Sequence, residues 1–304
     1  MTKPVPMSEH TIWAKILDQA IAFRHQLHQS PELTWQEELT TQRIRQQLDQ
    51  LGIAWRECGK HGTVATIAAN QPGRHVGLRG DIDALPIHEA CELAFKSQTP
   101  GKMHACGHDG HTAALWAAAA WLKHSEDTLS GPVSFLFQLA EEGGHGAESM
   151  IKHGALDGLD VIYGWHNWPA MPFGQAVCPD GAVMSGNGTF EIEVLGKGGH
   201  ASQPELCKDP VLAAAAITLN LQQILSRKLP PQAAAVVNVS SIEAPSASTV
   251  IPETAKLSGS IRLSDPSLRD TINEAIRQIS QDTARAYGVK AKVHCEARYD
   301  ATIN

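Results

Sequence analysis

The chain has 304 residues, of which 42% are hydrophobic and 19% charged, and its net charge is −7 with neutral histidines. This composition is that of a folded protein, long enough to bury a large core and to hold two domains. The acidic balance and the absence of basic runs argue against a nucleic-acid partner. No stretch approaches the roughly twenty apolar residues that cross a bilayer, so no membrane partner is expected.

The cysteines and the N-terminal residues predict a cytoplasmic protein. Six cysteines are spread along the chain without a CxxC pair, which favours free thiols in a reducing compartment. Residues Met1 to His10 are polar and contain two prolines, so they lack the apolar core of a signal peptide.

The first half of the chain predicts helices that alternate with strands. Ser8 caps a helix that runs to about Gln29, and a second helix runs from about Gln36 to Leu51, with Gly52 at its end. Strands follow at 63–69, 75–79, 133–138 and 160–165, and helices at 110–123 and 146–153. This alternation predicts a layered, mainly parallel α/β sheet. In such sheets binding sites collect beyond the carboxyl ends of the strands.

A change of composition near residues 185–188 indicates a second, smaller domain. Strands are expected at 189–195, 234–240, 249–251, 256–263 and 289–297, and helices at 209–229 and 266–287. Strands that flank two helices in this order predict an α+β domain of the split βαβ kind. The expected division is a larger domain over 1–184, resumed at about 298–304, and a smaller domain over 185–297.

The heptapeptide MHACGHD at 103–109 is the stretch richest in side chains that bind metal ions. Cys106 and His108 lie where the helix over 110–123 is expected to begin, and both the helix field and a bound ion favour a thiolate there. Sulfur and nitrogen ligands together with carboxylates suit zinc, manganese, cobalt or nickel. An isolated C-x-H pattern is more often a buried structural cysteine beside a capping histidine.

Further metal-binding side chains follow three other predicted strands. Glu141 and Glu142 are adjacent, and neighbours in extended backbone point opposite ways, so one can bind metal while the other acts as a general base. His166 follows the next strand, and Asp81 and Asp83 suit the orientation of a ligand. Each feature alone is more often a surface pair, a core histidine or a capping residue. Their common place at strand ends predicts that they meet.

Five motifs follow one another along the chain: RGDIDALP (79–86), MHACGHD (103–109), AEEGG (140–144), WHNWP (165–169) and GGHASQP (198–204). In this order they resemble the M20 metallopeptidase family, and within it the amidohydrolase branch of hippurate hydrolases, N-acyl-amino-acid deacylases and auxin-conjugate hydrolases. The resemblance covers essentially the whole chain. It implies a zinc-exopeptidase-like catalytic domain with an inserted lid and dimerisation domain.

The resemblance also implies roles for single residues of the larger domain. Glu141 matches the general base, and Asp83 matches the acidic residue that orients a ligand. Independently of the resemblance, His104 and His111 are expected to serve local packing or hydrogen bonding. The implied ligands of a two-metal site, with His108 between the ions, are Cys106, His108, Glu142 and His166.

The smaller domain is implied to complete the site and to form a homodimer. His200 matches a histidine that binds substrate and steadies the developing oxyanion in the partner subunit, and Arg262 resembles a residue that binds the substrate carboxylate. The expected cofactors are two divalent ions, zinc or manganese first, with cobalt or nickel as alternatives. The expected reaction is hydrolysis of the linear amide of a small N-acetyl or N-benzoyl amino acid.

Two other functions stay open on the same residues. One is a dipeptidase or aminopeptidase on this scaffold, and the other is a non-catalytic metal-binding protein. Family members continue beyond the point that corresponds to Asn304, and their tail supplies one more metal-binding histidine. The resemblance therefore favours a fragment of a longer product over a complete chain with an incomplete site.

Overall fold

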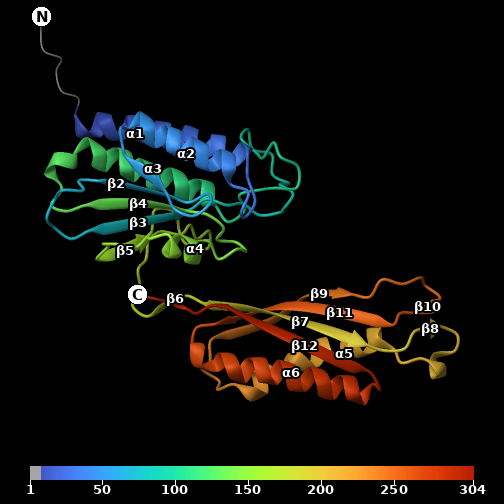
Figure 1. Cartoon of the computed structure of the whole chain (residues 1–304). Helices are drawn as coiled ribbons and strands as arrows, with labels where there is room; N and C mark the ends of the chain where they lie inside the picture. The colour runs from blue at the N-terminus through green and yellow to red at the C-terminus, as the bar shows by residue number, and fades with distance from the viewer. Residues whose placement is uncertain (1–7) are drawn as a thin grey trace, which may run out of the picture. The chain divides into compact units, whose positions relative to one another are not determined.

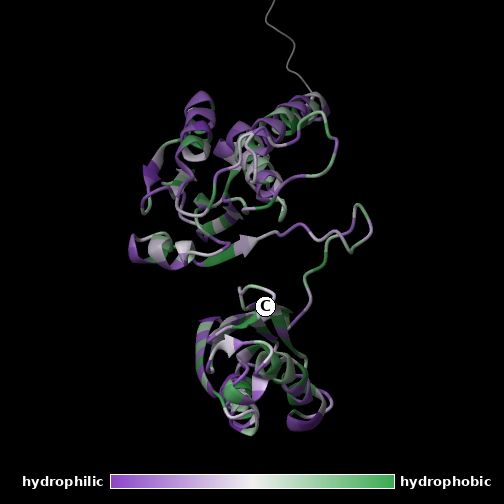
Figure 2. Cartoon of the chain, turned by 90° about the vertical axis from the view of Figure 1, so that its right-hand side faces the viewer, coloured by the Kyte–Doolittle hydropathy of each residue, from purple (hydrophilic) through white to green (hydrophobic). Residues whose placement is uncertain are grey.

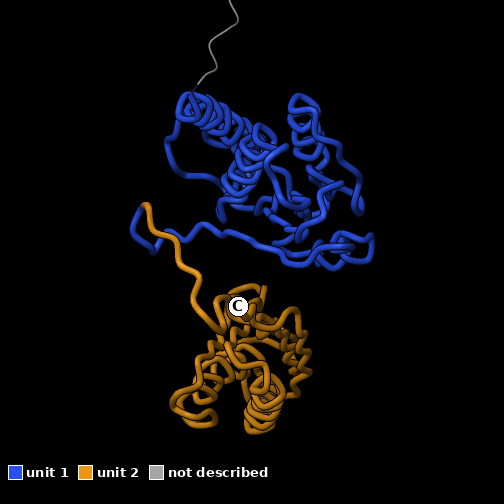
Figure 3. The backbone as a smooth tube through the Cα atoms, turned by 90° about the vertical axis from the view of Figure 1, so that its left-hand side faces the viewer, with its two compact units in different colours: residues 1–173 blue, residues 174–304 orange. Residues whose placement is uncertain are grey.

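The computed structural model describes residues 8–304 (Figure 1). The chain divides into two compact units, a first unit of Met1–Phe173 and a second unit of Gly174–Asn304, each with its own hydrophobic core (Figure 3). This division lies earlier in the chain than the expected boundary at 184/185. The expectation about a signal peptide concerns Met1 to His10, and residues 1–7 of that stretch lie outside the described part. No helix within 8–304 is long and apolar enough to span a membrane.

The first unit contains a mixed sheet with the strand order β1-β2-β4-β3-β5, of which Figure 1 labels β2, β4, β3 and β5. The pairs β3–β4 and β3–β5 are parallel, whereas β1 and β2 join the other edge antiparallel. Strand β4 is buried along its whole length, as expected for a central strand covered on both faces. The predicted layered α/β sheet is thus confirmed. Its strands are β1 (Trp55–Glu57), β2 (Thr63–Ile67), β3 (Val76–Asp81), β4 (Val133–Gln138) and β5 (Val161–Gly164).

Helices pack against this sheet through apolar faces that the sequence predicts. The Ser8 side chain accepts a hydrogen bond from the Thr11 amide and caps α1, as expected. α1 packs on α3, which in turn packs on β3 and β4. Gly107 has a φ of 90°, a left-handed conformation suited to glycine, and turns the chain into α3 at His108. The helices are α1 (Glu9–Gln29), α2 (Glu38–Gln50), α3 (His108–His124) and α4 (Gly146–Lys152), with a short 3-10 helix η1 (Glu126–Thr128).

The second unit is a four-stranded antiparallel sheet in the order β12-β7-β11-β9, with α5 and α6 packed on it. Buried residues alternate with more exposed ones along β7 and β11, and Figure 2, coloured by hydropathy, shows alternating hydrophobic and hydrophilic bands on strands of this unit. The chain order of strands and helices is the predicted split βαβ pattern. The main elements are β7 (Gly186–Leu195), α5 (Pro210–Leu221), β9 (Ala235–Glu243), β11 (Thr254–Leu263), α6 (Arg269–Ala286) and β12 (Lys290–Tyr299).

Short elements of the second unit depart from the sequence prediction. The single helix expected over 209–229 ends at Leu221, and a π-helical segment follows before the two prolines at 230 and 231. Strands of two or three residues were not expected, except near 249–251. The short elements are β6 (Ala182–Met184), β8 (Gly199–His200), η2 (Pro204–Leu206), η3 (Ile224–Lys228), β10 (Val250–Ile251), η4 (Pro266–Leu268) and β13 (Thr302–Ile303).

Candidate metal centre

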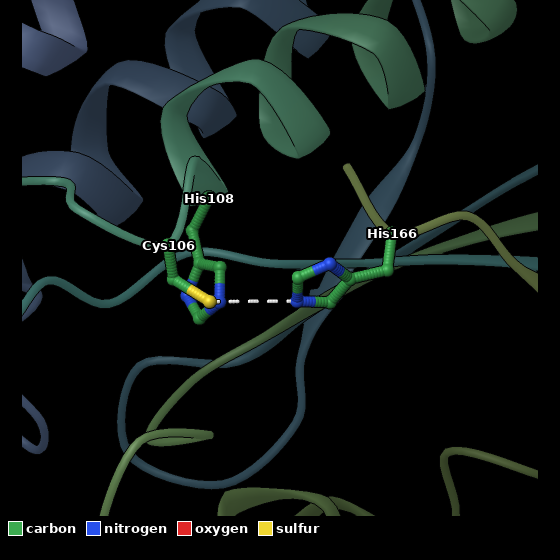
Figure 4. Close-up of side chains that lie close together, drawn as sticks. All are labelled: Cys106, His108 and His166. Atoms are coloured by element: carbon green, nitrogen blue, oxygen red, sulfur yellow. Dashed lines mark hydrogen bonds between the residues drawn. The ribbon is translucent and has the colours of Figure 1, made fainter. Parts of the chain in front are cut away.

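A thiol and two imidazoles meet beyond the carboxyl ends of the strands in the first unit (Figure 4). Cys106 and His108 come from the turn that enters α3, and His166 follows β5. The Sγ atom of Cys106 lies 3.5 Å from Nε2 of His166. Each of the three residues has a ligand atom within 4.8 Å of the ligand atoms of the other two, a spacing that suits a shared ion.

The two adjacent glutamates after β4 approach the same histidine. Nε2 of His108 lies 3.9 Å from Oε2 of Glu141 and 3.8 Å from Oε1 of Glu142. The expectation that extended backbone sends the two side chains opposite ways is wrong, because residues 141–144 form turns rather than a strand. Exposure separates them instead: the Glu141 side chain is 40% exposed and that of Glu142 only 17%.

His108 is the residue common to every candidate metal group within 8–304. Its Nδ1 lies 3.3 Å from Oδ1 of Asp83, which leaves Nε2 facing the glutamates. Burial lowers the pKa of His108, but contacts with Asp83, Cys106 and Asp81 outweigh burial and raise the pKa to about 11. The surrounding carboxylates thus strongly favour a positive charge at this position, and a divalent cation supplies such a charge.

The thiol and the remaining imidazole favour their charged forms. The nearby imidazoles of His108 and His166 lower the pKa of Cys106, and the bond to Cys106 raises the pKa of His166. Burial raises the pKa of Glu142, and the negative charges of nearby carboxylates raise it further. A thiolate is the form of cysteine that binds metal.

His111 serves hydrogen bonding, as the sequence predicts. Its Nδ1 lies 2.6 Å from Oδ1 of Asp81, and its Nε2 accepts a hydrogen bond from the Asn167 amide at 2.8 Å. Because Nε2 is the acceptor, Nδ1 carries the proton and donates it to Asp81. Both ring nitrogens are therefore engaged, although Asp81, His108 and His111 are spaced like a metal group. The imidazole links the end of β3 to the backbone that follows His166.

His104 serves packing without hydrogen bonding. The residue is 4% exposed, and neither ring nitrogen has a hydrogen-bond partner among the described residues. Burial lowers its pKa to about 4, so the ring is neutral in the folded unit near pH 7.

The donor atoms of the cluster fit a divalent ion. Nε2 of His108 and Oε1 of Glu142 are buried and have no hydrogen-bond partner within residues 8–304. Buried polar atoms normally have a partner, and such orphans call for a bound species. Sulfur, imidazole nitrogen and carboxylate oxygen together match zinc and its neighbours in the first transition row.

Two residues that sequence reasoning missed hold this cluster in place. The Thr34 hydroxyl donates to Oδ2 of Asp83 at 2.8 Å, and Oε1 of Glu37 accepts from the Ala140 amide at 2.8 Å. Both residues precede α2 and lie outside the motifs that pointed to the site. The roles of His200 and Arg262 stay predictions. Both residues belong to the second unit, where Nδ1 of His200 lies 2.7 Å from Oγ of Ser202.

Comparison with known proteins identifies the family. Residues 77–296 match the model of peptidase family M20/M25/M40. The chain belongs to this family. The hippurate hydrolase of Campylobacter jejuni is 38% identical over 287 residues, which cover 92% of this chain and 74% of the relative. The N-acetyl-L-cysteine deacetylase of Bacillus subtilis is 40% identical over 276 residues, which cover 90% of this chain and 66% of the relative.

Two solved structures share the fold. A putative aminohydrolase from methicillin-resistant Staphylococcus aureus has a TM-score of 0.84 at 34% identity, over 97% of this chain and 79% of that one. The YXEP protein of Bacillus subtilis, a dinuclear metal-binding peptidase of the M20 family, has a TM-score of 0.75 at 33% identity, over 96% and 76%. Together with relatives named as amidohydrolases, these matches make the chain a metal-dependent amidohydrolase.

Proposed function

We propose that this M20 enzyme hydrolyses the amide bond of N-acyl amino acids of the N-acetyl or N-benzoyl type, with Glu141 as the general base. Its relatives are named hippurate hydrolase, N-acetyl-L-cysteine deacetylase and N-acyl-L-amino acid amidohydrolase. The observation that carries the proposal is the unequal exposure of the two glutamates beside His108. Glu142 has a buried, unpartnered oxygen that suits a ligand, while Glu141 is 40% exposed and accessible to water.

Two divalent ions, zinc or manganese, are the proposed cofactors. Asp83 is proposed to orient the imidazole of His108 through its Nδ1. When bound, such ions polarise an acyl carbonyl and lower the pKa of water toward neutrality. The residues proposed to hold them are Cys106, His108, Glu142 and His166.

The proton transfers are assigned to Glu141. Its carboxylate accepts a proton from the attacking water as the new C–O bond forms at the acyl carbon. It then returns that proton to the amide nitrogen as the C–N bond breaks, which releases a carboxylic acid and a free amino acid. His200 is proposed to steady the oxyanion in the active site of the partner subunit, a contribution of about 3 kcal/mol per donor, and Arg262 is proposed to bind the substrate carboxylate. A homodimer through the second unit is part of the proposal.

A Glu141→Gln variant tests the assignment. An amide cannot accept the proton, so kcat on hippurate and on N-acetyl-L-cysteine should fall by about 100-fold or more, while metal content stays at the wild-type level. Glu148→Gln, a change at an exposed glutamate of α4, is the matched control. A Glu141→Gln protein that is as active as the wild type would rule out the mechanism. A preference for free-amine dipeptides over N-acyl substrates would favour a dipeptidase instead.

A further inference from the structure

The turn after β4 is held by two buried carboxylates. Oε1 of Glu37 accepts from the Ala140 amide at 2.8 Å, and Asp83 accepts from the amides of Glu141 and Glu142, each at 3.0 Å. Three consecutive amides therefore all donate to carboxylate oxygens. The bonds to Asp83, whose pKa is lowered so that it stays ionised, are charge-assisted and stronger than those between neutral groups.

Ala140 is the point at which the chain changes direction. Its φ is 48°, in the left-handed region, which costs a non-glycine residue about 1–2 kcal/mol. The residue is fully buried, and its carbonyl oxygen accepts from the Gly146 amide at 3.0 Å. The conformation of Ala140 determines the direction in which Glu141 and Glu142 leave β4. Such strain persists only where the surrounding structure fixes it.

Glu37 comes from a distant part of the chain and is oriented toward this turn. It occupies the N-cap position of α2 but makes no side-chain capping bond to the helix. The side chain is completely buried, and Oε2 has no hydrogen-bond partner among the described residues. Burial of a carboxyl group is unfavourable unless a hydrogen bond compensates for it. The bond from the Ala140 amide supplies such compensation.

We propose that Glu37 is a positioning residue of the hydrolytic site, which holds the Ala140 amide and thereby directs the side chains of Glu141 and Glu142 toward His108. Glu37 touches no reacting atom, and its effect passes through the backbone of the turn. The inference rests on the proposed roles of Glu141 as base and Glu142 as ligand. Asp83 accepts from the next two amides, so the two carboxyl groups together bind three consecutive amides of the turn.

The test compares substitutions at Glu37 with one at Glu32. Glu37→Leu removes the acceptor, whereas Glu37→Gln keeps an oxygen for the Ala140 amide. Glu32 is the matched control because, among the residues described, its carboxylate accepts from the amides of Leu39 and Thr40 at the start of α2. For each protein, hydrogen exchange of the segment 139–144 is measured by mass spectrometry, together with metal content and with kcat and KM on hippurate in Mn²⁺.

In Glu37→Leu we expect faster exchange at 140–142 and a kcat lower by about 100-fold, the cost of a base displaced by about 1 Å, with KM near the wild-type value. Glu37→Gln should match the wild type in exchange and kcat, and Glu32→Leu should leave both unchanged at the turn. Wild-type exchange and kcat in Glu37→Leu, or the same losses in Glu32→Leu, would overturn the inference.

A replacement variant and a separate criterion for the proposed function keep the inference about Glu37 testable. If Glu37→Leu does not fold, Glu37→Asp replaces it, because its carboxyl is one methylene too short and should reproduce the faster exchange. A wild-type exchange pattern in Glu37→Asp would then overturn the inference. If the wild-type protein fails to hydrolyse hippurate and N-acetyl-L-cysteine, the proposed function fails, while the exchange of 140–142 still decides whether Glu37 holds the turn.

Discussion

The buried carboxyl of Glu37 should make the stability of the first unit depend on pH. Burial raises its pKa from 4.5 to about 7, and interactions with its own backbone amide and with that of Ala140 only partly oppose this rise. The neutral carboxyl is therefore the form that the fold prefers below about pH 7. Glutamine is permanently neutral, has the same shape and keeps an acceptor oxygen. Glu37→Gln should therefore remove this dependence of stability on pH.

The direction in which stability changes with pH follows from the number of protons that the folded and unfolded states bind. The unfolded chain releases the Glu37 proton near pH 4.5, whereas the folded chain keeps it until about pH 7. Between these values the folded state binds more protons, so the free energy of unfolding falls as pH rises. At about 1.4 kcal/mol per pH unit, the difference between 4.5 and about 7 amounts to a loss of about 3 kcal/mol, complete above pH 7.

Urea unfolding of Glu37→Gln and wild type in EDTA measures this loss. All seven tryptophans lie between Trp13 and Trp168, so their fluorescence follows the first unit alone. We expect nearly equal stability at about pH 4 and an advantage of up to about 3 kcal/mol for Glu37→Gln at about pH 8. Glu57→Gln, at a side chain that is 69% exposed, controls for the loss of one negative charge. An advantage that does not change with pH would refute the reasoning.

Two substitutions test other parts of the site. His111→Ala should weaken Mn²⁺ or Zn²⁺ binding by about 10–100-fold, because the imidazole links Asp81 to the backbone after β5; an unchanged affinity in competition with a fluorescent chelator would contradict this role. Gly146→Ala should destabilise the first unit by about 1–3 kcal/mol, because its Cβ would lie 1.8 Å from the carbonyl oxygen of Leu139. Gly143→Ala should not, since nothing lies within 4 Å of that position, and equal unfolding midpoints for the two would count against the packing argument.

Long periodic segments of the sequence predicted most of the fold. The helix capped by Ser8 and the strands that alternate in burial have patterns of many residues, so local signals suffice to find them. Strands such as β8 and β13 have two residues each and carry no period. They exist because neighbouring backbone supplies hydrogen bonds, which a single sequence does not reveal.

The convergence at the strand ends was predictable for a topological reason. Parallel strands β3, β4 and β5 place their carboxyl ends at one edge, so the residues that follow them meet there regardless of their separation in sequence. This rule does not apply to Glu37, because Glu37 precedes a helix and contacts a turn that lies 103 residues later in the chain. Its contact depends on tertiary packing alone.

Local sequence patterns do not decide which of the two adjacent glutamates is the base and which is the ligand. Alternation along a strand predicted that Glu141 and Glu142 diverge, yet the left-handed Ala140 ends the extended backbone just before them, and both side chains reach within 4 Å of Nε2 of His108. What distinguishes them is burial, 40% against 17% exposure, and burial depends on how the whole turn is held. The assignment of base and ligand therefore depends on the carboxylates that bind the backbone of the turn.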